Sequence, residues 1–550
     1  MRYNYLREDR VYISCSNRRR RPEVLILFPH PVPPTQTAPP QSRPLRDAAI
    51  LTAITFTSFF LLGYHPFAED AGIYLSGIHL ALNPALYPAS RAFVLAHMHL
   101  SFFADFFAFT VRYLHIPLAW ALLSAHILLL LLLFIAIRRL AVQCFASPIA
   151  QWMAVALTAF CLSTPIAGTA LFIADPWLTP RSFAAPFNLL LLSTVLDRGP
   201  LHRRLWIALP ALLIALCFHP LMAIYGIGFA LVLWTLHARR SHGTLRVCLA
   251  AVLAATIIVY TQQHVSESPA YIHAALTRTY FYLGEWQWYE LVGLAAPLLL
   301  FAWIFHSNRS GSTTYARNRA ALSGAALACG ITAILISAIF VHPASHSHLL
   351  ARLQPLRIFH VIYILLFLLL GGMLAEWAAS RMQHPAFVLA PILCAAAGMM
   401  FFCERQTFPA SGHLEMPWQA PVNPWQQAFL WARDNTPRDA LFALDANYIS
   451  TDGEDAQNFR ATAERSSLSD YSKDGGSSAI FPQLAETWQL GQQRSANLSN
   501  LPDTARIAQL APSGVTWVVL QEKFQTGSAQ THLPCPYRNS TVLVCQLPAE

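Results

Sequence analysis

Two adjacent carboxylates follow the first long apolar run of this chain. Glu69 and Asp70 come directly after the run 48–64, and Tyr74 follows four residues later. Carboxylates at the end of a membrane-spanning helix are costly to desolvate, so they suggest a functional site. The pair could bind a divalent cation such as Mg²⁺ or Mn²⁺, or one member could take a proton from a hydroxyl group. The alternative is a solvated acidic loop, but the small and aromatic neighbours favour a site.

A second loop on the same side of the predicted membrane region contains Asp175 and Arg181. Asp175 could join Glu69 and Asp70 around one metal ion or one substrate. Arg181 could hold a phosphate through two parallel hydrogen bonds, because its guanidinium matches phosphate geometry. The alternative is an Asp175–Arg181 ion pair that only orders the loop.

A third loop contains Arg352, Gln354 and Arg357. Two guanidinium groups at the level of the lipid headgroups suit a pyrophosphate or a lipid phosphate. Alternatively, these two Arg side chains only extend along the apolar region so that their charged ends reach water at the membrane surface. His219, which precedes Pro220 at another turn, could approach the same pocket as a substrate-binding residue or could be structural.

The composition shows what must position these residues. The chain has 550 residues, of which 55% are hydrophobic and only 12% are charged. Soluble domains contain about 25% charged residues, so most of this chain is expected to lie in lipid. The sequence therefore predicts a mainly α, polytopic membrane protein. Its net charge of +9 comes with Arg residues in short loops, a distribution that indicates membrane topology and no nucleic-acid partner.

A membrane-spanning helix needs about 20 mainly apolar residues. By this measure about eleven spans are predicted: 48–64, 117–137, 148–171, 183–197, 204–219, 221–237, 246–262, 289–306, 320–341, 358–378 and 386–403.

Arginine distribution predicts the orientation. Arg residues concentrate in alternate loops, at 138–139, 198–204, 239–246, 309–319 and 381. Such loops face the cytoplasm, which places the Pro- and Arg-rich tail 1–47 inside and residues 404–550 outside, in the periplasm if the source is bacterial. The tail could also reflect a start codon assigned too far upstream. The long first outer loop, 65–116, contains the apolar segment 91–112, which we expect to be an interfacial helix or a re-entrant segment.

Residues 404–550 are more polar and read as a small α/β domain. A helix is expected over 423–437, with Trp425, Phe429 and Arg433 on one face. Strands are expected over 440–444, 515–520 and 541–545, and they could form a parallel sheet. No nucleotide-binding motif occurs in this region. The polar segments 459–465 and 470–476 could face the membrane pocket and help to bind an acceptor, or could be surface loops.

Cys535 and Cys545 lie near the end of this outer region. If the region is exported to an oxidising compartment, they could form a disulfide that closes a short hairpin. The alternative is two unpaired thiols.

With its many spans, acidic pair in the first outer loop, second acid at Asp175 and outer C-terminal domain, the chain resembles the GT-C superfamily of membrane glycosyltransferases. Segment 431–440 also resembles the start of their outer domains. The resemblance implies inverting transfer of a sugar from a polyprenyl-phosphate donor, in or at the membrane lipid, to a glycan, lipid or protein acceptor. Asp70 or Glu69 would deprotonate the acceptor, with a metal optional. Arg357, Arg352 or Arg181 would stabilise the leaving phosphate.

Two other classes of function remain open. A transporter would need broken spans or internal repeats with polar groups at mid-membrane, whereas the polar groups here gather at one face. A non-catalytic scaffold, whose outer domain binds envelope partners, would tolerate the loss of both Glu69 and Asp70.

Overall fold

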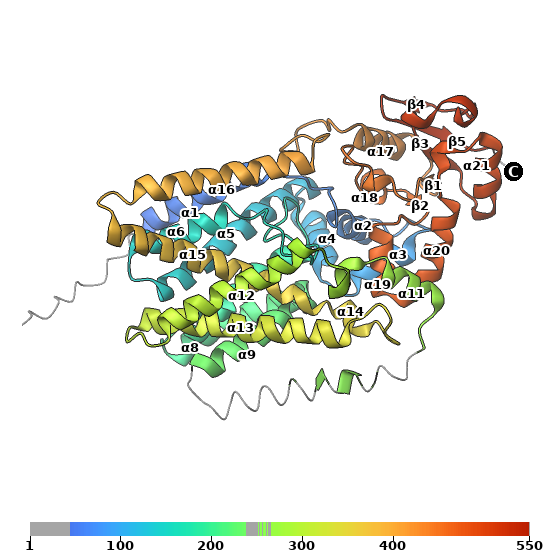
Figure 1. Cartoon of the computed structure of the whole chain (residues 1–550). Coiled ribbons are helices and arrows are strands. Elements are labelled where there is room, and N and C mark those ends of the chain that lie inside the picture. Colours follow the sequence, from blue (N-terminus) through green and yellow to red (C-terminus); the bar gives the residue numbers. More distant parts are fainter. Residues whose placement is uncertain are drawn as a thin grey trace, which may run out of the picture. The chain divides into compact units, whose positions relative to one another are not determined.

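The computed structural model describes residues 44–237 and 266–548, together with residues 251, 254, 255, 257–259 and 261. The predicted tail, up to residue 43, and most of the predicted span 246–262 lie outside the described residues. The chain divides after Asp47, and all contacts discussed below lie within the unit Ala48–Glu550. The described residues are mainly helical, with twenty α-helices and one small sheet (Figure 1).

Eight helical segments among the described residues are long and apolar enough to cross a membrane. They are α1 (Pro44–Leu62), α5 (Leu118–Cys144), α8 (Leu201–Phe218), α9 (Pro220–His237), α12 (Trp288–Asn308), α13 (Thr314–Phe340), the segment Leu349–Arg381 formed by α14 (Leu349–Leu353), a 3₁₀ turn and α15 (Phe359–Arg381), and α16 (Ala386–Thr407). These segments fit a membrane protein. They coincide with eight of the eleven predicted spans.

The prediction of a span over 148–171 is wrong. Helix α6 (Pro148–Ala159) ends after 12 residues, about 18 Å of helix against a hydrocarbon core of about 30 Å. The chain then forms a tight loop in which Pro165 and Phe172 are bridged. The residue before a proline avoids helical geometry, and Ala167 and Ala170 have positive φ angles. The apolar run therefore folds back instead of crossing.

Two other predicted segments differ in detail from the structure. The segment 183–197 is helical as α7 (Pro180–Leu196), but at 17 residues it is shorter than the eight candidate spans. The segment 91–112 forms α3 (Arg91–Met98) and α4 (Phe103–Leu114), which meet at a bend of 97°. That geometry corresponds to a broken span or a re-entrant loop.

The largest buried cluster lies between the long helices, where α15 packs on α6 and α7 packs on α5, α8 and α9. A Cβ atom on Gly371 of α15 would lie only 2.7 Å from the carbonyl oxygen of Met153 in α6. Small residues allow this close approach of helices inside a membrane. Figure 1 shows α12 and α13 side by side, and these two helices also contact each other.

The C-terminal region contains a five-stranded sheet in the order β2-β1-β3-β5-β4. The strands are β1 (Leu441–Leu444), β2 (Ser466–Ser467), β3 (Trp517–Gln521), β4 (Tyr537–Arg538) and β5 (Val542–Gln546). Strand β1 is parallel to β2 and β3, whereas β5 is antiparallel to β3 and β4. The sheet is therefore mixed, and only its first half is parallel.

Helix α17 (Pro424–Asn435) begins after Asn423, whose side chain accepts hydrogen bonds from the Trp425 and Gln426 amides. It buries Trp425 and Phe429, as the sequence predicted. Arg433 is not buried with them. Its side chain is 39% exposed and pairs with the exposed Asp434. The helix therefore packs Trp425, Ala428, Phe429 and Ala432 into the core of the C-terminal region.

The C-terminal region packs against the loop region 65–116 and does not form a separate body. Helix α18 (Phe459–Ala463) contacts α2 (Ala71–Leu82), and α19 (Lys473–Ile480) contacts α3. Helix α11 (Pro269–Leu276) contacts both α19 and α20 (Ala485–Arg494), and α21 (Asp503–Leu510) completes the helices. Residues on both sides of position 404 thus belong to one compact unit.

Candidate functional site

The acidic pair lies in a tight loop between α1 and α2 that is held from two sides. The backbone N–H of His65 donates to the Pro176 carbonyl at 2.8 Å. Glu69 has a φ of +47°, a conformation that a non-glycine residue keeps only where its surroundings enforce it. Here its backbone N–H donates to the Gln457 side chain at 2.8 Å, and its carbonyl accepts from the Asn458 amide.

Lys473, the first residue of α19, contacts both carboxylates. Its ammonium donates to Glu69 and lies 3.2 Å from the nearer Asp70 oxygen. The Lys473 side chain is only 11% exposed, whereas the side chains of Glu69 and Asp70 are 42% and 38% exposed. The pair therefore keeps an open side while a cation covers the other side.

Arg181, near the start of α7, joins the two acidic loops. Its guanidinium donates to Asp175 at 2.6 Å and lies 3.7 Å from Asp70. Asp175 and Arg181 are almost fully buried. The Asp175–Arg181 ion pair, which the sequence left open as an alternative, is therefore present. Its Arg181 guanidinium also lies close to Asp70.

The cations set the protonation state of Asp70. Burial of this carboxyl raises its pKa, but the neighbouring charges of Lys473 and Arg181 outweigh burial and hold the pKa below its ordinary value. Arg357 adds to the same lowering, so it also lies within electrostatic reach. For Asp175 burial dominates, and the pKa is raised although Arg181 opposes the shift.

Tyr74 lies one turn into α2, close to this charge. Its ring makes an edge-to-face contact with His97 and also contacts Phe103, with centroid distances of 5.7 Å in both cases. Burial and the negative charge of Asp70 raise the pKa of the Tyr74 hydroxyl to about 12. Tyr74 is therefore a neutral donor beside Asp70 at physiological pH.

Arg357 has no carboxylate within ion-pair distance among the described residues, and its buried Nε atom has no hydrogen-bond partner there. It lines a small cavity together with Gln354 and Tyr280. A guanidinium with no carboxylate in direct contact, within electrostatic reach of Arg181, is a candidate phosphate-binding group.

Three further residues predicted to bind substrate have defined places within the fold. The Nδ1 atom of His219 accepts a hydrogen bond from the Met222 amide at the start of α9. Arg352 donates to the carbonyl of Ile480 at 3.1 Å, at the end of α19. Gln354 adopts a left-handed turn between α14 and α15, with a φ of +47°. Of these, His219 and Gln354 still lie near Arg357.

The predicted metal set of Glu69, Asp70 and Asp175 is not supported. Within residues 44–237 and 266–548, no group of three or more His, Cys, Asp or Glu side chains is arranged to hold a metal ion. Lys473 and Arg181 contact the carboxylates that were expected to coordinate it. Two such cations beside the ligands oppose the binding of a third positive charge.

A cavity with a volume of about 290 Å³ begins beside the same loop. Phe67 and Leu75 line it on one side, and the first turn of α5 and the connector 412–422 line it on others. Trp120 and Trp418, which belong to these two segments, are exposed, and their rings contact each other at a tilt of 31° with centroids 5.4 Å apart. Exposed tryptophan pairs are typical of the membrane–water interface.

Sequence reasoning missed Lys473, Gln457 and Asn458 as members of the site. The segment 470–476 was noted as polar and as able to face the pocket, but no spacing rule connects position 473 with position 70. Gly72 was the other sequence feature that could have pointed to a close contact with this loop. A Cβ atom there would lie 1.9 Å from the Asn458 side chain, so the loop needs glycine to accept this clamp.

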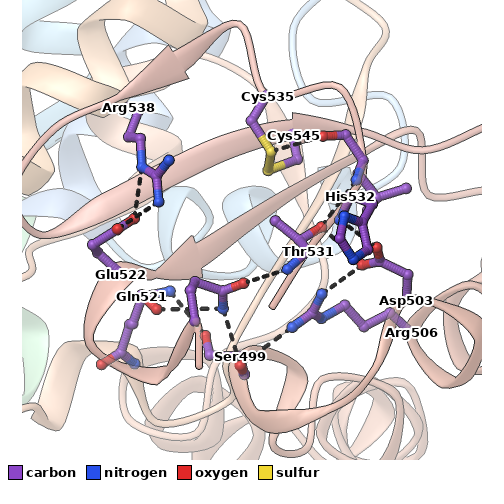
Figure 2. The surroundings of a disulfide bond; sticks show 12 residues. Ser499, Asp503, Arg506, Gln521, Glu522, Thr531, His532, Cys535, Arg538 and Cys545 are labelled. Carbon is purple, nitrogen blue, oxygen red and sulfur yellow. Dashed lines mark hydrogen bonds and ion pairs between the residues drawn. A yellow bond between two sulfur atoms is a disulfide. The ribbon is translucent and has the colours of Figure 1, made fainter. Parts of the chain in front are cut away.

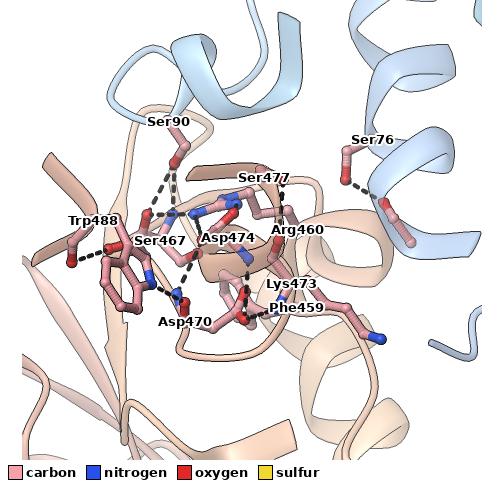
Figure 3. Close-up of polar contacts among 12 residues, drawn as sticks. Ser76, Ser90, Phe459, Arg460, Ser467, Asp470, Lys473, Asp474, Ser477 and Trp488 are labelled. Atoms are coloured by element: carbon pink, nitrogen blue, oxygen red, sulfur yellow. Dashed lines mark hydrogen bonds and ion pairs between the residues drawn. The ribbon is translucent and has the colours of Figure 1, made fainter. Parts of the chain in front are cut away.

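A second charged cluster lies beside the site and is buried. Arg460 makes two hydrogen bonds to Asp474, at 2.6 and 2.7 Å, and Asp474 also accepts from the backbone N–H of Asp470. Figure 3 shows these residues together with Lys473, the first residue of α19. The carboxylate of Asp470 accepts the Lys473 amide at 2.6 Å, so this cluster fixes the start of the helix that carries Lys473.

The C-terminal sheet contains a disulfide between Cys535 and Cys545 (Figure 2). Cys545 belongs to β5, and Cys535 precedes β4, so the bond closes the hairpin that the sequence suggested. Figure 2 also shows Arg506, which donates to Asp503 at 2.6 Å within α21.

Neither models of known protein families nor curated proteins compared with this sequence match it. The case for a function therefore rests on the geometry of the site.

Proposed function

We propose that this protein is a membrane glycosyltransferase of the GT-C type, which moves a sugar from a polyprenyl-phosphate donor to an acceptor in the cell envelope. One observation carries the proposal: a part-exposed carboxylate, Asp70, lies beside the cations of Lys473 and Arg181, in the loop that follows the long apolar helix α1. A carboxylate can accept a proton, and cations can bind a leaving phosphate.

The reaction would proceed in one displacement. The acceptor hydroxyl oxygen bonds to the anomeric carbon of the sugar, and the bond from that carbon to the donor phosphate oxygen breaks. The phosphate leaves with the electron pair, while the hydroxyl proton passes to Asp70. Attack from the side opposite the phosphate inverts the anomeric configuration. Arg357 and Arg181 stabilise the charge that grows on the phosphate.

Lys473 decides whether Asp70 can act as the base. A carboxylate with a lowered pKa is a weak base, and Lys473 is the cation with the largest lowering effect on Asp70. A bound donor phosphate gives the ammonium another anion to contact, and the pKa of Asp70 then rises toward its ordinary value. Lys473 therefore links donor binding to activation of the base.

The apolar cavity beside the loop supports a lipid-linked substrate. Its walls include Phe67, Leu75 and Leu122, and its volume of about 290 Å³ suits part of a hydrocarbon chain. The arginine distribution favours an orientation with a cytoplasmic N-terminus and residues 404–550 in the bacterial periplasm. In that orientation, the site faces the outer surface of the inner membrane, where lipid-linked sugars and envelope acceptors meet.

A non-catalytic scaffold is the second candidate, and one observation favours it. Both carboxylates are already paired with Lys473, and Gln457 and Asn458 clamp the same loop. These contacts would also serve as a latch that joins the C-terminal region to the membrane helices. In that case the outer region would bind envelope partners without any transfer reaction.

The test uses membranes that contain the full chain and a panel of labelled polyprenyl-phosphate sugars. The variants are Asp70→Asn and Glu69→Gln, with Asp105→Asn as the matched control, because Asp105 is an exposed carboxylate in the same outer loop. Transfer should persist in the parent and the control, and it should fall about 100-fold or more in Asp70→Asn if this residue is the base.

Folding of each variant is checked by its elution in detergent. Unchanged transfer in well-folded Asp70→Asn and Glu69→Gln would remove the acidic pair from the mechanism. No transfer from any donor by the parent, with no donor bound, would favour the scaffold.

A further inference from the structure

A small cavity lies beneath Arg181, among α5, α7 and α15. Its volume is about 30 Å³, and its lining includes His126, His360 and Asp175 together with apolar residues such as Leu130 and Ala185. It is distinct from the larger cavity that the proposed function uses, and no step of the proposed reaction involves it.

Each of the three polar residues has one buried atom without a hydrogen-bond partner in the part of the chain that the structure describes. These atoms are Nε2 of His126, Nδ1 of His360 and Oδ1 of Asp175. The three side chains are more than nine-tenths buried. Buried polar groups in folded proteins are nearly always paired, with protein or with ordered water, so three unpaired atoms around one cavity require a partner.

The neighbouring contacts assign the hydrogen-bonding roles of two of these atoms, on His360 and Asp175. Nε2 of His360 lies 3.0 Å from the carbonyl oxygen of Ile173. A carbonyl only accepts, so Nε2 carries the proton, and Nδ1 of the neutral ring is an acceptor. Oδ1 of Asp175 is an acceptor too, because Oδ2 already accepts from Arg181. The remaining atom, Nε2 of His126, can carry a proton and donate.

Two acceptors and one donor are the complement of a water molecule, which donates two hydrogen bonds and accepts others. A buried water molecule needs a cavity of roughly 10–15 Å³ and two to four polar partners. This cavity, with about 30 Å³ and three polar residues, meets both conditions. A metal cation fits less well, because the only carboxylate of the lining is already neutralised by Arg181.

We propose that this cavity is a water-binding site, and that its water joins His126, His360 and Asp175 in one hydrogen-bonded chain beneath Arg181. The water donates to Oδ1 of Asp175, while Arg181 donates to Oδ2 of the same carboxylate. His126 and His360 are thus positioning residues for the arginine that reaches Asp70. The inference concerns how the chain folds around Arg181, and it holds whether or not the protein transfers sugars.

The decisive variant is Ala185→Val, which fills the cavity. Filling an empty apolar cavity raises the Tm, whereas displacing a required water leaves polar groups unpaired and lowers the Tm. We expect a lower Tm for the full chain in detergent. Ala302→Val is the matched control, because Ala302 is an exposed residue of α12, and its Tm should stay close to that of the parent.

Steric overcrowding would also lower the Tm, so Ala185→Val is repeated in a His126→Leu, His360→Leu background. That background removes two of the three polar partners of the water, so the added methyl groups should lower the Tm by less there than in the parent. An equal loss of Tm in both backgrounds would overturn the proposal, because it would show crowding alone.

Two further measurements test the bridge itself. The Tm losses of His126→Leu and His360→Leu should add to more than the loss of the double variant, because one water serves both residues. Strictly additive losses would contradict a shared water. A high-resolution cryo-EM map of the parent should show a density peak within hydrogen-bond distance of all three residues, and a clear map with an empty cavity would refute the site.

Discussion

The site around Asp70 and the cluster around Arg460 are two neighbouring groups of charges that differ in exposure. In the first, Lys473 covers Glu69 and Asp70, yet about two fifths of each acidic side chain stays exposed. In the second, Arg460 and Asp474 form a bidentate pair, and the Asp474 side chain is only 5% exposed. The two groups are joined through the start of α19, which carries both Lys473 and Asp474.

This difference teaches which charges can serve chemistry. A buried pair that satisfies its own hydrogen bonds has no room for a substrate, so its role is to fix the fold. A part-exposed carboxylate beside several cations can exchange one partner for another. The buried cluster thus acts as the rigid support, and the exposed one acts as the candidate reaction centre.

The largest effect should come from Arg460→Met. It leaves Asp474 and Asp470 buried without their cation, which costs about 3–5 kcal/mol. We expect a large fall in the Tm of the full chain in detergent, together with loss of ordered structure around α19. A Tm close to that of the parent would show that the cluster is not the support that we infer.

A smaller but clear effect should follow from Gly72→Ala. The added Cβ would lie 1.9 Å from the Asn458 side chain, and relieving such a clash typically costs about 1–3 kcal/mol. Gly228→Ala is the control, because nothing lies within 4 Å of a Cβ at that helical position. The comparison requires Gly72→Ala to lower the Tm and Gly228→Ala to leave it unchanged or raise it.

The stability of the protein should depend on pH through Asp470 in the buried cluster. Burial and the charge of Asp474 raise the pKa of Asp470 to about 7. The folded state therefore holds a proton that the unfolded state releases near pH 4, so this contribution to stability is complete below pH 4 and is lost as the pH rises to 7. Asp470→Asn should flatten the change in Tm between pH 5 and pH 8. An equally steep profile in this variant would assign the dependence to other groups.

The smallest effect on stability should come from Lys473→Met. Its partners are part-exposed, so solvent screening limits the loss to about 1 kcal/mol or less. The pKa of Asp70 should rise, because the first cation that lowers it is gone. Carbodiimide labelling near pH 5, which requires a protonated carboxyl, should increase at Asp70 when followed by mass spectrometry. If Lys473→Met destabilises as strongly as Arg460→Met, the distinction between the two clusters fails.

Local patterns predicted much of the fold. Long apolar runs predicted the eight helical segments that are now observed as candidate spans, since burying apolar surface in lipid needs only length and composition. The short apolar segments 440–444, 515–520 and 541–545 became β1, β3 and β5 within one or two residues. The run 148–171 was misread because hydropathy does not register the effect of Pro165 on the preceding backbone.

The site was predicted only in part, for a different reason. Sequence reasoning found Asp70, Glu69, Asp175 and Arg181, because charged residues next to apolar runs stand out. It did not find Lys473, which comes from a segment about 400 positions away. The predicted role of Arg352 in the site stays a prediction, and the structure adds that its side chain donates to the carbonyl at the end of α19.

The sequence by itself determined that this chain is mainly helical, rich in membrane-length segments, and equipped with acidic residues where those segments end. These are properties of neighbouring residues, and local hydrophobicity and charge are enough to reveal them. Only the tertiary structure decided which cation meets which carboxylate, and that His126, His360 and Asp175 share one cavity. Those contacts depend on the packing of helices and loops that are distant in sequence, so no local pattern contains them.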